Sequence, residues 1–302
     1  MTAIAQTVGP TELPGHMPRL DLVEAGLRNL MEDFWLLPPQ FQPAVYWSVR
    51  LMQEARARSL LQSIRGARFL AFGFFPQGRD EFGFGVIAYT HPTVDPRTSQ
   101  MEPLDVDNQR FQVLVRPIQL EEHRPQTQPA NGTSSCWART RLASDAVGPG
   151  LLTAKHVTNG VIGGLIPLSD GTQGEVLDIG PEGIDVALVA TTEDPAARKI
   201  PVMRLIPAWW EVQFDGPSGQ HHTTVAQTGD ILGIYGSNAL PLRVILSDGG
   251  KSGDSGALVR GREDGAAVGV YLGTGTDPSE RTYGFCQHAY QATEIMQMEL
   301  YE

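Results

Sequence analysis

From residue 134 onward, apolar segments are short and turn residues separate them at intervals of ~8–12 residues. This spacing is typical of the strands of a β-sandwich or β-barrel. Turn-forming residues are plentiful, with 33 Gly and 22 Pro in 302 residues. The strands predicted in this part are 134–142, 149–154, 174–179, 184–191, 208–214, 225–235, 242–247, 256–260, 266–273 and 281–287, and a helix is predicted over 289–301.

The part of the chain before residue 120 has a mixed pattern. Apolar residues at helical spacing predict one helix from Asp21 to Phe34 and a second that begins near Pro43, a favoured residue for the first turn. Three apolar stretches with turn residues between them predict strands. These strands lie at 68–75, 81–90 and 110–118.

A polar stretch separates the two parts. Residues 119–133 contain two prolines and lack apolar periodicity, which is a linker composition. The sequence therefore predicts a mainly β protein in three pieces. These are a small α+β domain over 1–120, a linker over 121–133 and a β domain over 134–302.

Charge and composition limit the partners of the chain. The formal net charge is −11, from 34 acidic and 23 basic residues, which disfavours nucleic acid and anionic membrane surfaces as partners. No stretch approaches the ~18 apolar residues of a membrane span, and the N-terminus does not resemble a signal peptide. The two cysteines, Cys136 and Cys286, form no disulfide framework. We therefore expect a cytoplasmic protein with reduced thiols.

Three local motifs carry residue types that act together in nucleophilic catalysis. In the first, an apolar strand runs into His156; in the second, Asp185 opens an apolar strand; in the third, Ser255 lies in a glycine-rich loop that leads into a strand. The segments are LLTAKHV at 151–157, GIDVALV at 183–189 and GKSGDSGALV at 250–259.

The chemistry of acyl transfer gives each motif a role. A serine hydroxyl is a weak nucleophile and needs an adjacent base, and histidine is the side chain that titrates nearest neutral pH. A buried carboxylate fixes the imidazole tautomer. Backbone N–H groups must stabilise the oxyanion, and the glycine at 253 allows the N–H groups of Gly253 and Ser255 to face one point.

Each motif alone has a structural interpretation, as a core histidine, a strand-start aspartate or a β-turn. Their order, histidine then aspartate then serine, is that of chymotrypsin and differs from subtilisin and the α/β-hydrolases. His221-His222 and Cys286-x-His288 match no zinc spacing, so no metal and no cofactor are predicted.

With these motifs, residues ~131–302 resemble the chymotrypsin-like serine endopeptidases, in the compact bacterial-type branch. The segments TAKHV, GIDVALV and GKSGDSGALV are similar to that family's three motifs, with Ala257 in place of a family glycine. The resemblance implies two six-stranded antiparallel barrels with the active site between them. It also implies His156 as general base, Asp185 as its orienting acid and Ser255 as nucleophile.

The resemblance raises a question about Asp254. In the secreted branch of the family this aspartate pairs with an N-terminus that cleavage has freed, but no activation sequence precedes the β domain here. Two alternatives remain from the sequence: Asp254 has another donor, or cleavage within 119–133 creates the N-terminus.

The family's primary specificity pocket is floored by the residue six positions before the serine, which is Gly249 here. Its wall is expected at Val270-Tyr271-Leu272-Gly273, so the resemblance favours an uncharged substrate side chain. Asp248 and Asp277 are close enough in the sequence to change this preference.

The sequence therefore predicts an intracellular serine endopeptidase that acts on proteins or peptides. Residues 1–120 would regulate it, dock a protein partner or support the barrels. The alternative is a catalytically silent protein of the protease fold that binds or scaffolds.

Overall fold

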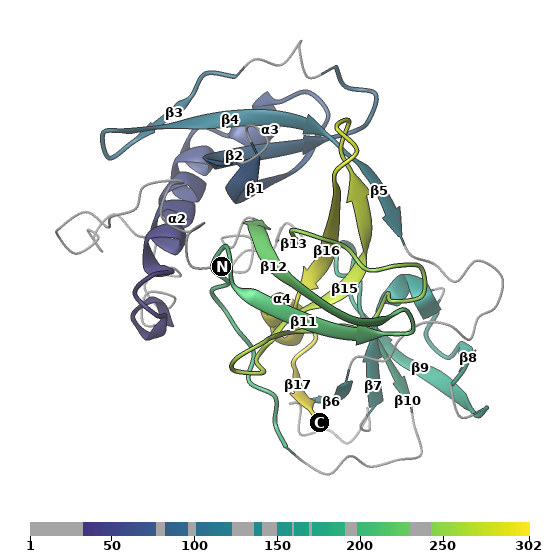
Figure 1. Cartoon of the computed structure of the whole chain (residues 1–302). Coiled ribbons are helices and arrows are strands. Elements are labelled where there is room, and N and C mark those ends of the chain that lie inside the picture. The colour runs from purple at the N-terminus through teal and green to yellow at the C-terminus, as the bar shows by residue number, and fades with distance from the viewer. Residues whose placement is uncertain are drawn as a thin grey trace.

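The structure is a computed structural model that describes residues 33–76, 82–95, 101–122, 136–140, 150–158, 160–168, 171–190, 198–229 and 243–302. It is mainly β, as predicted, with two sheets and few helices (Figure 1). In the part described, no helix is long and apolar enough to cross a membrane.

Residues 211–288 contain the strands of a closed six-stranded antiparallel barrel. Each strand pairs with two others, in the order β11-β14-β15-β16-β13-β12, and pairing between β11 and β12 closes the ring. Its interior is filled by side chains such as Val212, Val244 and Tyr271. The strands are β11 (Glu211–Gly216), β12 (Gly219–Gly229), β13 (Arg243–Leu246), β14 (Leu258–Gly261), β15 (Ala267–Thr276) and β16 (Thr282–His288).

A second sheet of six strands has the order β17-β6-β7-β10-β9-β8. Its buried side chains share one cluster with Leu258 and Val270 of the barrel, so the two sheets have a common core. The strands are β6 (Cys136–Thr140), β7 (Gly150–Thr153), β8 (Leu165–Pro167), β9 (Gln173–Ile179), β10 (Ala187–Ala190) and β17 (Met298–Tyr301).

The helix predicted over 289–301 is wrong in its second half. Helix α4 (Ala289–Ile295) ends early, Gln297 has a φ of 49°, and β17 then pairs antiparallel with β6. Met298 and Leu300 are buried while Glu299 and Tyr301 are partly exposed. This alternation has the period of a strand. The burial of Met298 and Leu300 in the core shared by the second sheet and the barrel outweighs the helical propensity of the segment.

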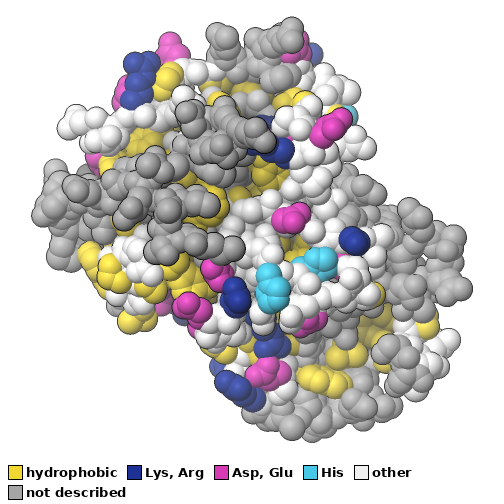
Figure 2. Space-filling model, in the orientation of Figure 1, with side chains coloured by type: hydrophobic (Ala, Val, Ile, Leu, Met, Phe, Trp, Pro, Cys, Tyr) yellow, Lys and Arg dark blue, Asp and Glu magenta, His cyan; other side chains and the backbone are white. Residues whose placement is uncertain are grey.

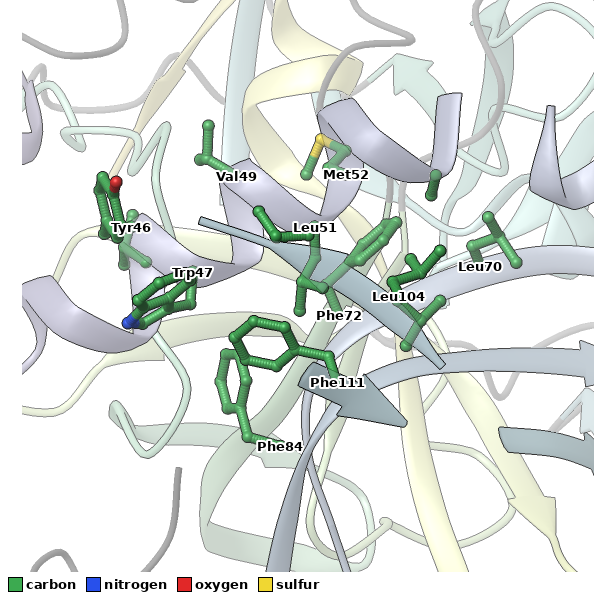
Figure 3. Packing of buried hydrophobic residues seen from close by; sticks show 14 of the residues in the cluster. Tyr46, Trp47, Val49, Leu51, Met52, Leu70, Phe72, Phe84, Leu104 and Phe111 are labelled. Carbon is green, nitrogen blue, oxygen red and sulfur yellow. The ribbon is translucent and has the colours of Figure 1, made fainter. Parts of the chain in front are cut away.

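Within the residues described, the N-terminal part has the predicted helix near Pro43 and the three predicted strands. Helix α2 (Gln42–Ala57) lies across the sheet, with side chains such as Leu51 and Trp47 directed at Phe72 and Phe111 (Figure 3). The helix predicted from Asp21 lies largely outside the described residues. The other elements are α3 (Leu60–Ser63), β1 (Ala67–Pro76), β2 (Phe82–Thr90), β3 (Leu104–Val106) and β4 (Gln109–Pro117).

The N-terminal strands continue the sheet of the barrel. Ala71–Gly73 of β1 pair with Gln227–Gly229 of β12. Gly73 has a φ of 149°, and a Cβ there would lie 2.8 Å from the carbonyl oxygen of Ala226, so only glycine allows this approach. Across this junction the buried Gln227 accepts a hydrogen bond from Tyr89 Oη at 2.7 Å and donates to the carbonyl of Phe74 at 2.8 Å.

A second strand pairing, besides that of β1 with β12, connects the N-terminal part of the chain to the barrel. Strand β5 (Gln119–Glu122) pairs antiparallel with β15, in a stretch whose composition predicted the start of a linker. The rest of that linker, 123–133, lies outside the described residues. The division into domains at 120 and 133 stays a prediction about which parts fold on their own.

Both cysteines are buried, and they do not form a disulfide with each other. Burial raises the pKa of the Cys136 thiol to about 12. In Figure 2, the acidic and basic side chains of the described residues are interspersed on the visible face.

Gln227→Leu is expected to reduce the free energy of unfolding by about 2–5 kcal/mol, because it leaves the Tyr89 hydroxyl and the Phe74 carbonyl buried without partners. Urea denaturation measures this loss. Adding Tyr89→Phe should recover part of it, since the hydroxyl is then absent. A Gln227→Leu protein as stable as the wild type would contradict the prediction.

The stability of the protein is expected to fall in acid because of His288. Burial lowers the pKa of this imidazole to about 4 from 6.5, so below pH 6.5 the unfolded chain takes up a proton that the folded chain refuses. The contribution is complete above pH 6.5 and is lost as the pH falls toward 4, up to ~3 kcal/mol. In urea denaturation at pH 4.5 and 7.5, His288→Asn should show a smaller difference between the two pH values than the wild type. Equal differences would contradict this.

Candidate active site

His156 and Asp185 lie close to the ends of neighbouring strands of the second sheet. His156 belongs to a 3₁₀ turn (Lys155–Thr158) that begins two residues after the end of β7, and Asp185 lies two residues before the start of β10. Because β7 and β10 pair antiparallel, with Thr153 opposite Ala187, the end of one strand meets the start of the other. The two motifs are therefore brought together by a single strand pairing.

The two side chains are joined by short hydrogen bonds. His156 Nδ1 lies 2.7 Å from Asp185 Oδ2, and the backbone N–H of His156 donates to Asp185 Oδ1 at 3.0 Å. A carboxylate only accepts, so it holds the proton on Nδ1 and leaves Nε2 as the basic nitrogen. The His156 side chain is 5% exposed and the Asp185 side chain is 21% exposed, so the imidazole is shielded from bulk water while the carboxylate is partly exposed.

Ser255 lies in the tight loop that leads into β14. Gly253 and Gly256 both have a φ of 98°, a conformation that favours glycine. The loop is tied to β15, because Gly256 N–H donates to the carbonyl of Tyr271 at 2.8 Å. Ser255 is fully buried, and its Oγ donates to the carbonyl of Leu272 at 2.7 Å.

Leu272 contacts both the serine loop and the turn that carries the histidine. This residue packs with Ala154 and Val157, which flank His156 in the sequence, while its carbonyl holds the Ser255 hydroxyl. No hydrogen bond joins Ser255 to His156: among the described residues, the buried Nε2 of His156 has no hydrogen-bond partner. The structure thus pairs His156 with Asp185, while the Ser255 hydroxyl donates to Leu272.

Asp254 has donors within the barrel, which favours the first of the two alternatives from the sequence. Its fully buried carboxylate accepts from Ser218 Oγ at 2.6 Å, Ser218 N–H at 3.1 Å and Lys251 N–H at 2.7 Å. His221 Nε2 lies 3.2 Å from the same carboxylate and 2.7 Å from Ser218 Oγ. A Cβ at Gly250 would lie 2.6 Å from Asp254 Oδ2, so glycine leaves room for the carboxylate.

The sequence did not identify Ser218 and His221 as part of the site. They lie at the turn between β11 and β12, far from Asp254 along the chain, and the only signal was the pair His221-His222. The His221 ring stacks on Phe214, which stacks on Tyr271, at centroid distances of 4.6 and 4.8 Å. Tyr271 Oη in turn accepts from Gly250 N–H at 2.7 Å, so the stack supports the serine loop.

The residues predicted to form the specificity pocket lie in different surroundings. Val270 is buried in the core shared with the second sheet and Tyr271 in the core of the barrel, whereas the carbonyl of Leu272 accepts from Ser255 and Gly273 follows along β15. The backbone of Gly249 lies against Thr274, so closely that a Cβ would overlap its methyl group.

Neither aspartate near the predicted pocket offers an unengaged carboxylate. Asp248 accepts from Gly249 N–H at 2.8 Å. Asp277 accepts from Ser279 and Arg281 N–H at 2.9 and 3.1 Å and lies 3.8 Å from Arg116. Among the described residues there is no group of three or more His, Cys, Asp or Glu side chains that holds a metal.

Comparison with known proteins gives matches in structure only. No family model matches the chain, and no curated protein matches it in sequence. Among solved structures, the Nocardiopsis protease NAPase is 20% identical and covers 56% of this chain and 92% of its own, with a TM-score of 0.42. Thermobifida fusca protease A is 17% identical and covers 56% and 91%, with a TM-score of 0.42.

A third solved structure is described as a glutamic acid-specific serine protease that uses a histidine triad in substrate binding. It is 16% identical and covers 56% of this chain and 93% of its own, with a TM-score of 0.42. The closed barrel, the second six-stranded sheet and the three motifs between them define a chymotrypsin-like serine protease fold in this part of the chain.

Ser218→Ala is expected to destabilise the protein by about 1.5–3 kcal/mol, because the buried Asp254 carboxylate loses its hydrogen bond from the Ser218 hydroxyl. Urea denaturation measures the loss. His222→Ala is the matched control, since the His222 ring makes an exposed contact with Gln220, and a change within ~0.5 kcal/mol is expected. Equal effects of the two substitutions would contradict the role of Ser218.

Proposed function

We propose that the protein is a serine endopeptidase that hydrolyses peptide bonds through His156, Asp185 and Ser255. The observation that carries the proposal is the Asp185–His156 pair, at 2.7 Å, next to a buried Nε2 that makes no other hydrogen bond among the described residues. A basic nitrogen held in this way can accept a proton from a nearby hydroxyl.

The reaction proceeds in two stages. Ser255 Oγ turns from the Leu272 carbonyl, gives its proton to His156 Nε2 and attacks the carbonyl carbon of the peptide bond. The proposed donors to the resulting oxyanion are the N–H groups of Gly253 and Ser255. The carbon–nitrogen bond then breaks, the leaving amine takes the proton from Nε2, and water hydrolyses the acyl-enzyme by the same route.

The substrate and setting belong to the proposal as well. The absence of an acidic residue at position 249 supports a preference for an uncharged side chain before the cleaved bond. A cytoplasmic location and a docking role for residues 1–120 rest on the sequence alone.

A catalytically silent protein of the same fold is the second candidate. The observation that favours it is the burial of Ser255 with its hydroxyl bound to Leu272. A fluorophosphonate probe separates the two, because it labels a serine only when a base activates it. If the probe labels the wild type but not Ser255→Ala, the result supports the peptidase. If the probe does not label the wild type, the result supports the silent protein.

Ser255→Ala and His156→Ala are each expected to lower kcat by a factor of order 10⁶, and the double variant should be little worse, because the residues act as one unit. A fluorogenic peptide library gives the rates, and circular dichroism checks the fold. Peptidase activity of Ser255→Ala near that of the wild type would exclude the proposed nucleophile.

A further inference from the structure

Strand β5 pairs with the part of β15 that follows Leu272, the hydrogen-bond partner of Ser255. Its residues pair antiparallel with the end of β15, with Gln119 opposite Thr276 and Glu122 opposite Gly273 (Figure 1). Gly273 follows Leu272, whose carbonyl holds the Ser255 hydroxyl. The chain therefore runs along β15 toward the serine and ends its pairing one residue from the acceptor of that hydroxyl.

In the described part of the chain, β5 occupies the edge of β15 that β16 leaves unpaired at residues 273–276. From Gly273 to Thr276, β15 pairs on one side with β16 and on the other with β5. An extended peptide binds a sheet by adding a strand at a free edge, through main-chain hydrogen bonds. While β5 is paired, a peptide cannot add here.

The start of β5 is anchored to the barrel. Ile118, just before it, is 1% exposed and packs so closely on Gly275 that a Cβ there would lie 2.9 Å from Ile118 Cδ1. Arg116 donates to Tyr283 Oη at 2.9 Å and lies 3.8 Å from the buried Asp277. A tethered strand of this kind competes at an effective concentration in the millimolar range.

We propose that β5 acts as an intramolecular competitor of the peptide substrate, because it occupies the edge of β15 at residues 273–276. This inference rests on the proposed peptidase function. A substrate must displace β5 before its backbone pairs next to Ser255, and this competition raises KM.

Two variants change the pairing of β5 with β15 in opposite ways: one weakens it and the other fixes it with a disulfide. In the opened variant, Gln119→Gly, Leu120→Ser, Glu121→Gly and Glu122→Ser keep the chain length and weaken strand formation. In the locked variant, Gln119→Cys with Thr276→Cys replaces two exposed residues that face each other across the strands, within reach of a disulfide. The matched control is Asp105→Cys with Arg110→Cys, an exposed cross-strand pair between β3 and β4.

The opened variant should hydrolyse a fluorogenic peptide library with a KM about tenfold or more below that of the wild type. The oxidised locked variant should lose about tenfold or more of kcat/KM and regain it on reduction, while the control pair is unaffected by oxidation. If fluorophosphonate labels Ser255 but all variants hydrolyse at the wild-type rate, the inference is overturned and the peptidase function stands.

If fluorophosphonate labels no variant, the peptidase function fails and binding decides the inference. The probe is a fluorescein-labelled hexapeptide with the sequence of residues 117–122, Pro-Ile-Gln-Leu-Glu-Glu, measured by anisotropy against Ser255→Ala forms. Binding to the opened form with none to the oxidised locked form supports competition for the edge. Equal binding to both forms overturns it.

Discussion

Strand β15 is the element on which the rest of the structure depends. Its first half places Val270 in the core of the second sheet and Tyr271 in the core of the barrel, so one strand contributes side chains to both cores. The carbonyl of Leu272 holds the Ser255 hydroxyl, and the Leu272 side chain packs beside the histidine turn. Because successive side chains of a strand point to opposite faces, a single strand can connect both cores and the site.

A buried carboxylate fixes the serine loop. Asp254 is fully buried, and an isolated charge there would be costly unless hydrogen bonds compensate for lost hydration. Ser218 and the N–H of Lys251 provide them, and His221 extends the network to an aromatic stack that reaches the loop again through Tyr271. The loop is thus held by contacts from the barrel itself.

The sequence predicted the elements whose signals are local. The strands around His156 and Asp185 and the loop of Ser255 follow from apolar runs and glycines within a few residues of each side chain. Strand β5 was missed because its polar residues pair through the backbone, which leaves no side-chain pattern. Strand β17 was missed because its burial depends on β6, which is distant in the sequence.

The sequence by itself predicted that the chain is mainly β, that its motifs resemble those of serine proteases and which three residues those motifs supply. Only the tertiary structure decided that the Ser255 hydroxyl turns to Leu272, that Ser218 and His221 pair with Asp254 and that β5 lies on the edge of β15. The physical reason is the separation along the chain between the residues that interact. A local pattern records the conformation of neighbouring residues, whereas hydrogen bonds and strand pairings between distant segments depend on how the folded chain brings them together.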